Sequence, residues 1–170
     1  TVNLKVARHL ERELRARGHR VVLTRNDDRY LSLDARVARA HAAQADLVVS
    51  VHANAHRSPA VHGVETFHAG RRASAAARRL ARVVQQSVVR AVRSRRGGAR
   101  DLGVKRAGFF VLQNTRMPAI LVEAGFLTHR REGRALARAA YRGAVARAIA
   151  AGVDRFARGR GATPQALALK

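Results

Sequence analysis

His52 has a residue type and a position that suit metal chemistry. It follows the largely apolar run DLVVSV at residues 46–51, and small residues flank the next polar residue, Asn54. Neutral imidazole is a common zinc ligand, and small neighbours at the end of a strand leave room for a metal ion and a substrate. The alternative is a loop histidine bonded only to the backbone, and His52 considered alone favours that alternative.

Glu123 lies within a second apolar run, PAILVEAGF, at residues 118–126. A carboxylate is rarely buried unless it is paired or does chemistry. Apolar surroundings raise the pKa of a carboxyl group in general, which suits a general acid or base. The alternative is a buried pair with one of the many arginines, and spacing alone does not separate the two.

Glu65, in GVETFHA at residues 63–69, is a weaker case of the same kind. It either pairs with an arginine or hydrogen-bonds to a metal ligand and so orients that ligand. His68 comes three positions after Glu65, so in a strand the two side chains would point to opposite faces. We therefore do not expect a metal site made of His62, Glu65 and His68.

The composition limits the class of protein. The chain has 170 residues, 47% of them hydrophobic, and a formal net charge of +23 that comes almost entirely from arginine. Such a charge favours polyanions, although a coding bias toward arginine and alanine would produce it too. The basic runs are scattered and lie away from aromatic residues, which argues against a dedicated nucleic-acid interface. Cysteine is absent, and we find no apolar run of membrane-spanning length.

The elements that must position these residues alternate along the chain. Apolar spacing and capping signals predict helices at residues 2–17, 33–44 and 74–95, with one or two closing helices within 128–159. Strands are predicted at 19–25, 46–52, 63–69, 109–113 and 118–126, with a glycine-rich basic loop at 95–108. The alternation predicts one α/β domain, a mostly parallel sheet flanked by helices, over residues 1–158, followed by a flexible tail at 159–170. Functional groups gather at the carboxyl ends of strands in such sheets, where His52 and Glu123 would lie.

Four stretches resemble the zinc-dependent N-acetylmuramoyl-L-alanine amidase family. They are VVLTRNDDRYLSLDARVARAHAAQADLVVSVHANAH, GVETFHAG, DLGVKRAGFFVLQNTRMPAILVEAGFLTH and YRGAVARAIAAGVDRF. The resemblance implies hydrolysis of the amide between N-acetylmuramic acid and L-alanine of peptidoglycan by a zinc-activated water. It implies that His52 is a zinc ligand, that Glu123 is the catalytic glutamate, and that Asn54 and Glu65 have supporting roles.

The sequence also departs from that family. The family's first strand ends in a Gly-His-Gly-Gly-like turn and is followed by a Glu-Lys pair, and each motif supplies a zinc ligand. This sequence opens at TVNL, so we expect the first strand to be missing and zinc binding by this chain to be poor. One interpretation is an N-terminally truncated catalytic domain, and the other is a catalytically impaired relative that binds cell wall or polyanions. Both imply an extracytoplasmic, monomeric protein, with no signal segment in this chain, that contacts peptidoglycan and anionic cell-wall polymers rather than nucleic acid or membrane.

Overall fold

The computed structural model describes residues 1–70, 73–93, 99–159 and 166–169. Within these residues the helices are α1 (Val2–Arg15), α2 (Leu33–Ala42), α3 (Ala75–Arg93), α4 (Phe110–Asn114), α5 (Arg130–Ala137) and α6 (Ala139–Arg158). The strands are β1 (Arg20–Leu23), β2 (Leu47–Asn54), β3 (Val64–Ala69), β4 (Asp101–Ala107), β5 (Ala119–Phe126) and β6 (Ala166–Leu169). The predicted α/β fold is confirmed.

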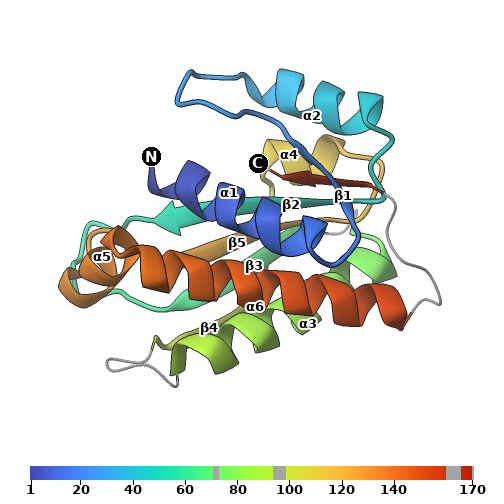
Figure 1. Ribbon diagram of the computed structural model, residues 1–170. Helices are drawn as coiled ribbons and strands as arrows, with labels where there is room; N and C mark the ends of the chain where they lie inside the picture. Colours follow the sequence, from blue (N-terminus) through green and yellow to red (C-terminus); the bar gives the residue numbers. More distant parts are fainter. Residues whose placement is uncertain (71–72, 94–98, 160–165, 170) are drawn as a thin grey trace.

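The strands form a single twisted sheet in the order β1-β6-β2-β5-β3-β4. All neighbouring pairs are parallel except β3 and β5, which run antiparallel. The two strands that carry His52 and Glu123, β2 and β5, are therefore parallel neighbours near the middle of the sheet. Their carboxyl ends lie at the same edge, next to the beginning of β3 (Figure 1).

Helices cover both faces of the sheet and form two cores. Helices α1, α3 and α6 pack against one face, where Leu10, Leu80 and Ile149 are fully buried together with Val49 and Val122 of the central strands. The other core lies beneath α2 and α4 (Figure 1). Burial of these side chains from water supplies the main driving force for this layered arrangement.

The second core shows to which face of the sheet the candidate site residues project. Val48 and Leu121 point into it from β2 and β5, and they pack with Val37 of α2 and Val111 of α4. Side chains two residues apart in a strand share a face, so the positions that continue this row beyond Val48 and Leu121 also face the side of α2 and α4. His52 and Glu123 occupy those positions.

Residues 109–113 were predicted as a strand, and this prediction is wrong. Phe110–Asn114 form the short helix α4, with Val111 and Leu112 buried and the two phenylalanines more than a third exposed. A short apolar run does not distinguish a strand from a buried helical turn. Val111 and Leu112 are adjacent and both buried, which one turn of helix allows. In a strand with one exposed face, burial would instead alternate from residue to residue.

Residues 95–108 were predicted as a loop, and this is wrong for the part that the structure describes. Asp101–Ala107 form β4, which pairs with β3 at the edge of the sheet, while residues 94–98 lie outside the described residues. Charged residues and glycine have low strand propensity, so β4 was not recognised as a strand. Edge strands often carry charged residues, because these prevent pairing with the edge strand of another chain. Gly103 has a φ of +78°, a conformation that favours glycine.

The C-terminal segment differs from the flexible tail expected at residues 159–170. Ala166–Leu169 form β6, which lies between β1 and β2 and is parallel to both, while residues 160–165 lie outside the described residues. Leu167, Ala168 and Leu169 are fully buried. The C-terminal strand β6 therefore joins β1 to β2 and is part of the continuous sheet.

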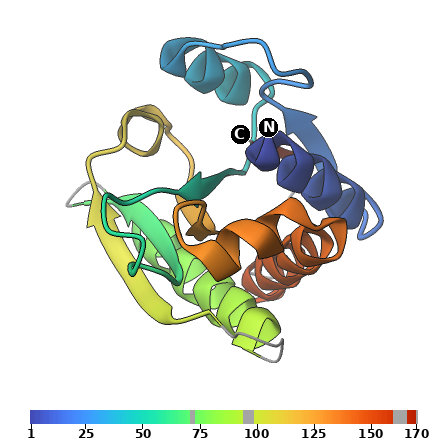
Figure 2. The ribbon, with the colours of Figure 1, turned by 90° about the vertical axis from the view of Figure 1, so that its left-hand side faces the viewer.

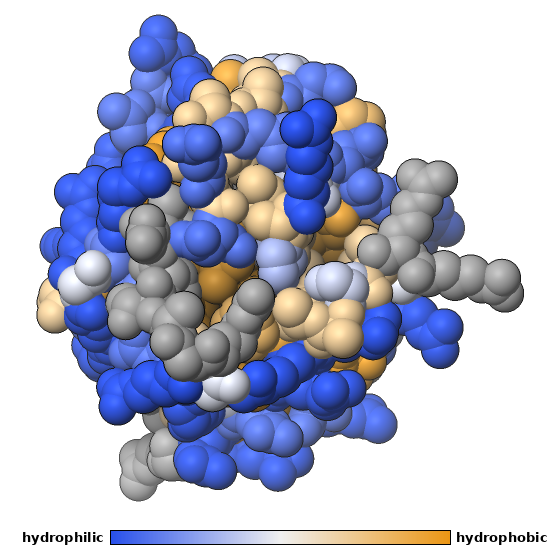
Figure 3. Space-filling view, turned by 90° about the vertical axis from the view of Figure 1, so that its right-hand side faces the viewer, coloured by the Kyte–Doolittle hydropathy of each residue, from blue (hydrophilic) through white to orange (hydrophobic). Residues whose placement is uncertain are grey.

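The 34 lysine and arginine residues are spread along the sequence. On the end of the molecule that lies to the right in Figure 1, hydrophilic side chains form the periphery and apolar side chains gather near the middle (Figure 3). In the part of the chain that the structure describes, no helix is both long and apolar enough to cross a bilayer.

Candidate functional site

Three neighbouring strands bring His52, Glu123 and Glu65 into one row. His52 of β2 is the register partner of Glu123 of β5, and Glu65 of β3 is the register partner of Glu123 on its other side. Register partners in a sheet project to the same face, so the three side chains lie next to one another. Figure 2 looks onto the end of the molecule where β2 and β5 finish.

The row lies where the sheet emerges from the core. β2 is buried from Leu47 to Val51 and becomes partly exposed from His52 onward, where its pairing with β5 also shifts before Asn54. β5 stays buried over its whole length, and Glu123 is 7% exposed. A change of register re-aims side chains at a strand end, which gives His52 access to solvent beside a buried carboxylate.

Glu65 is a buried carboxylate whose oxygens have defined partners. Asn54 Nδ2 donates a hydrogen bond of 2.9 Å to Oε1, and the ammonium group of Lys105 on β4 forms an ion pair with Oε2. The arginine expected as its partner is thus replaced by a lysine from the segment that was predicted to be a loop. The positive charge of Lys105 and the hydrogen bond from Asn54 allow the two buried carboxylates, Glu65 and Glu123, to lie side by side.

Lys105→Met is expected to lower the free energy of unfolding by about 1–3 kcal/mol, because it leaves a nearly buried carboxylate without its cation. The side chain of Lys105 is 46% exposed, so water screens part of the loss. Urea unfolding measures the change, and Arg106→Met, the exposed neighbour on the same strand, is the control with an expected effect within about 0.5 kcal/mol. Adding Glu65→Gln should restore part of the loss; additive effects in this cycle would contradict the coupling.

The residues around His52 do not complete a catalytic zinc site. Such a site normally has three protein ligands and an open position. Glu65 is already engaged by Asn54 and Lys105. Among the described residues, one set of three histidine or acidic side chains has all its donor atoms within 4.8 Å of one another, and that set does not include His52.

That set consists of His62, His129 and Glu132, of which the sequence singled out only His62. His62 precedes β3, His129 follows β5 and Glu132 lies on α5. Sequence reasoning missed the other two because their proximity depends on the antiparallel pairing of β3 with β5. The signal available in the sequence was the spacing of His129 and Glu132, which are three residues apart at the start of a helix and so can lie on one face of it.

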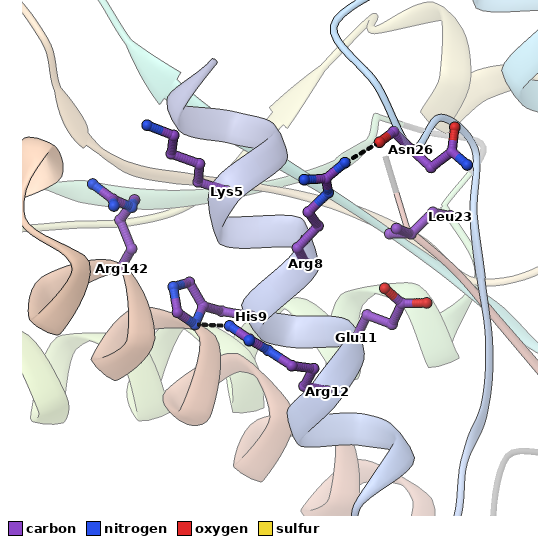
Figure 4. Close-up of a pocket in the computed structure, with 8 residues that line it drawn as sticks. All are labelled: Lys5, Arg8, His9, Glu11, Arg12, Leu23, Asn26 and Arg142. Carbon is purple, nitrogen blue, oxygen red and sulfur yellow. Dashed lines mark hydrogen bonds between the residues drawn. The ribbon is translucent and has the colours of Figure 1, made fainter.

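A cationic cavity lies beside α1, away from the His52–Glu123 row. It has a volume of about 530 Å³, and Figure 4 draws its lining residues, which include Lys5, Arg8, Arg12 and Arg142. Arg12 Nη2 lies 2.7 Å from Nδ1 of His9. Burial, followed by the positive charges of Arg12 and Arg142, lowers the pKa of His9, so the neutral ring accepts this hydrogen bond. The four cations suit the cavity to anions; its lining also includes His9 and Glu11, and Glu11 forms an ion pair with Arg15.

A histidine and a buried glutamate thus lie side by side at the carboxyl edge of the central strands, where functional groups gather in α/β domains and where both could take part in acid–base chemistry. The chain belongs to the N-acetylmuramoyl-L-alanine amidase family: the Amidase_3 family model matches residues 1–155. The family prediction made from the sequence is confirmed.

Known relatives agree with this assignment. The chain is 38% identical over 148 residues to the N-acetylmuramoyl-L-alanine amidase LytC of Bacillus subtilis, covering 87% of this chain and 29% of LytC. An N-acetylmuramoyl-L-alanine amidase structure from Clostridium difficile 630 superimposes with a TM-score of 0.88 at 34% identity, covering 94% of this chain and 84% of that one. The catalytic domain of CwlV from Bacillus (Paenibacillus) polymyxa gives 0.83 at 34% identity, covering 92% and 83%. The chain thus spans less than a third of LytC but most of these solved amidase chains.

Proposed function

We propose that this domain is a peptidoglycan hydrolase that cleaves the amide bond between N-acetylmuramic acid and the L-alanine of the stem peptide. Membership of the amidase family and the match to solved amidase chains support this proposal. The observation that carries it is the register pairing of His52 with Glu123 at the end of β2 and β5.

Glu123 is the proposed general base and then the general acid. It takes a proton from a water molecule as the water oxygen adds to the amide carbonyl carbon. It then gives the proton to the amide nitrogen as the carbon–nitrogen bond breaks. The products are the free lactyl carboxylate of muramic acid and the free amino terminus of L-alanine. A carboxylate held at one position in a buried strand suits both transfers, because the same group accepts the proton and then returns it.

His52 is the proposed metal-facing residue of the site. Zinc bound there would supply a polarised carbonyl and a more acidic water. The described residues do not complete its ligand set, so we derive no step through zinc. Asn54 and Glu65 have proposed supporting roles: with Lys105 they hold a fixed hydrogen-bonded group next to Glu123.

The setting follows from the proposed substrate. Peptidoglycan lies outside the cytoplasmic membrane, so we propose an extracytoplasmic site of action. Anionic cell-wall polymers are proposed as additional contacts of the basic surface, whose net charge is +23. We propose that the domain acts as a monomer.

Purified sacculi provide the test. Incubation with the chain, in buffer with and without added zinc, is expected to release new L-alanine amino termini and muramic acid lactyl ends in equal amounts, as measured by mass spectrometry. Cleavage only within the glycan or within the peptide would contradict the proposal. Binding to sacculi that falls steeply with salt, with no release under either condition, would instead identify a binding relative.

A further inference from the structure

His62, His129 and Glu132 come from three different elements that meet at one edge of the sheet. β3 runs antiparallel to β5, so the residue two positions before β3 lies beside the turn that leaves β5. The imidazole rings of His62 and His129 are stacked, with centroids 4.6 Å apart and an interplanar angle of 20°. His62 Nδ1 lies 3.8 Å from Glu132 Oε1, and all three donor groups lie within 4.8 Å of one another.

Two atoms in this cluster are buried without a hydrogen-bond partner. Glu132 is 5% exposed, and its Oε2 accepts a hydrogen bond of 2.7 Å from the Phe126 N–H, whereas its Oε1 has none. Nδ1 of His129 is likewise buried and unsatisfied. Leaving such groups unpaired is costly, because each has lost its water without gaining a partner. One donor atom from each of Glu132, His129 and His62 lies within 4.8 Å of the other two, and His62, whose side chain is 36% exposed, gives access from solvent.

The backbone is shaped to hold the carboxylate in place. Gly125 has a φ of +134°, and a Cβ at this position would lie 3.2 Å from Glu132 Oε2. A side chain there would be strained and would press on the carboxylate. The Phe126 N–H fixes one oxygen and so aims the other at the two imidazoles.

We propose that His62, His129 and Glu132 bind a divalent transition metal, with zinc the expected ion. Imidazole nitrogens and a carboxylate oxygen are donors that zinc accepts, and three protein ligands leave a fourth position open. Metal–ligand bonds of about 2.0–2.1 Å require the donor atoms to close from their present separations, which rotation of the partly exposed His62 permits. The bound ion joins the loop before β3 to the turn after β5. The site is distinct from His52 and does not depend on the proposed amidase reaction.

The test uses metal alone with the full chain freed of metal by chelation. Zinc is titrated by calorimetry, and cobalt is followed by its visible absorption, which reports nitrogen and oxygen ligands. We expect one equivalent to bind to the unmodified chain. His62→Ala and His129→Ala should each weaken binding at least about 100-fold, since loss of a direct ligand exceeds the usual effect of losing an outer partner.

Matched variants separate this site from others. His56→Ala removes an exposed histidine of the same loop, and His52→Ala removes the histidine of the proposed catalytic row; both should retain the bound equivalent. Glu132 is buried and bonded to the Phe126 N–H, so a folding defect would confound Glu132→Gln, and the partly exposed His62 carries the decisive result. Unchanged affinity in His62→Ala and His129→Ala, loss of binding in His52→Ala, or no binding by the unmodified chain would overturn the proposal. Sacculus cleavage is measured in a separate assay, so the metal-binding result can be interpreted even if the chain has no amidase activity.

Discussion

Glu123→Gln is expected to lower the rate of L-alanine amino-terminus release from sacculi by a factor of about 10²–10⁴. Glutamine keeps the size of the side chain but does not take a proton from water or return one to the leaving amine. Because Glu123 is 7% exposed at the side of His52, no bulk water replaces it easily in this role. Initial rates on purified sacculi, measured under the conditions in which the unmodified chain is active, give the ratio.

The control for this variant is Glu11→Gln. Glu11 lies on α1, where its side chain is 19% exposed and pairs with the 60% exposed Arg15, so its loss should leave the rate unchanged and cost at most about 1 kcal/mol of stability. Circular dichroism and urea unfolding verify that Glu123→Gln is folded. A folded Glu123→Gln variant that cleaves at the rate of the unmodified chain would remove Glu123 from the chemistry.

The central part of the fold was readable from the sequence because its signals are strong. The apolar runs that became β2 and β5 are longer than a turn and lie between amphipathic helices, and this pattern predicts a buried parallel strand. Helix α1 was equally clear, since Val6, Leu10 and Leu14 recur every four residues and are all buried. Where burial on one or two faces sets the pattern, sequence alone was sufficient.

The edges of the fold were not readable in this way. β4 is a polar edge strand, and α4 is a single buried turn that has the composition of a strand. Neither obeys a long periodicity, because each contacts the core through only part of its surface. The placement of β6 was hidden for another reason: a four-residue apolar segment acquires its strand conformation from the two strands on either side.

The sequence likewise predicted some features of the candidate site and not others. His52 and Glu123 could be singled out one at a time, since each is a polar residue at the end of or within an apolar run. That they are register partners, with Glu65 beside them, depends on strand order, which sequence spacing does not contain. Lys105 and the His129–Glu132 pair escaped notice because each acquires its partners only through the pairing of β3 with β4 and β5.

Leu167→Ala is expected to lower the free energy of unfolding by about 2–5 kcal/mol, the usual cost of truncating a fully buried leucine. Leu167 is 0% exposed and lies between Val21 of β1 and Leu47 of β2 in the sheet. Its side chain lies in the core beneath α1, α3 and α6, so its truncation leaves a cavity between the sheet and these helices. Urea unfolding gives the free energy, and the thermal midpoint should fall by roughly 2–4 °C for each kcal/mol lost.

Leu127→Ala is the matched control, because Leu127 is 48% exposed and the same truncation there should cost within about 0.5 kcal/mol. Equal small effects at both positions would mean that residues 166–169 do not dock between β1 and β2 in solution. The sheet would then lack a strand between β1 and β2. A large effect at Leu167 alone means that the C-terminal strand is part of the cooperative fold that supports β2 and, through it, the position of His52.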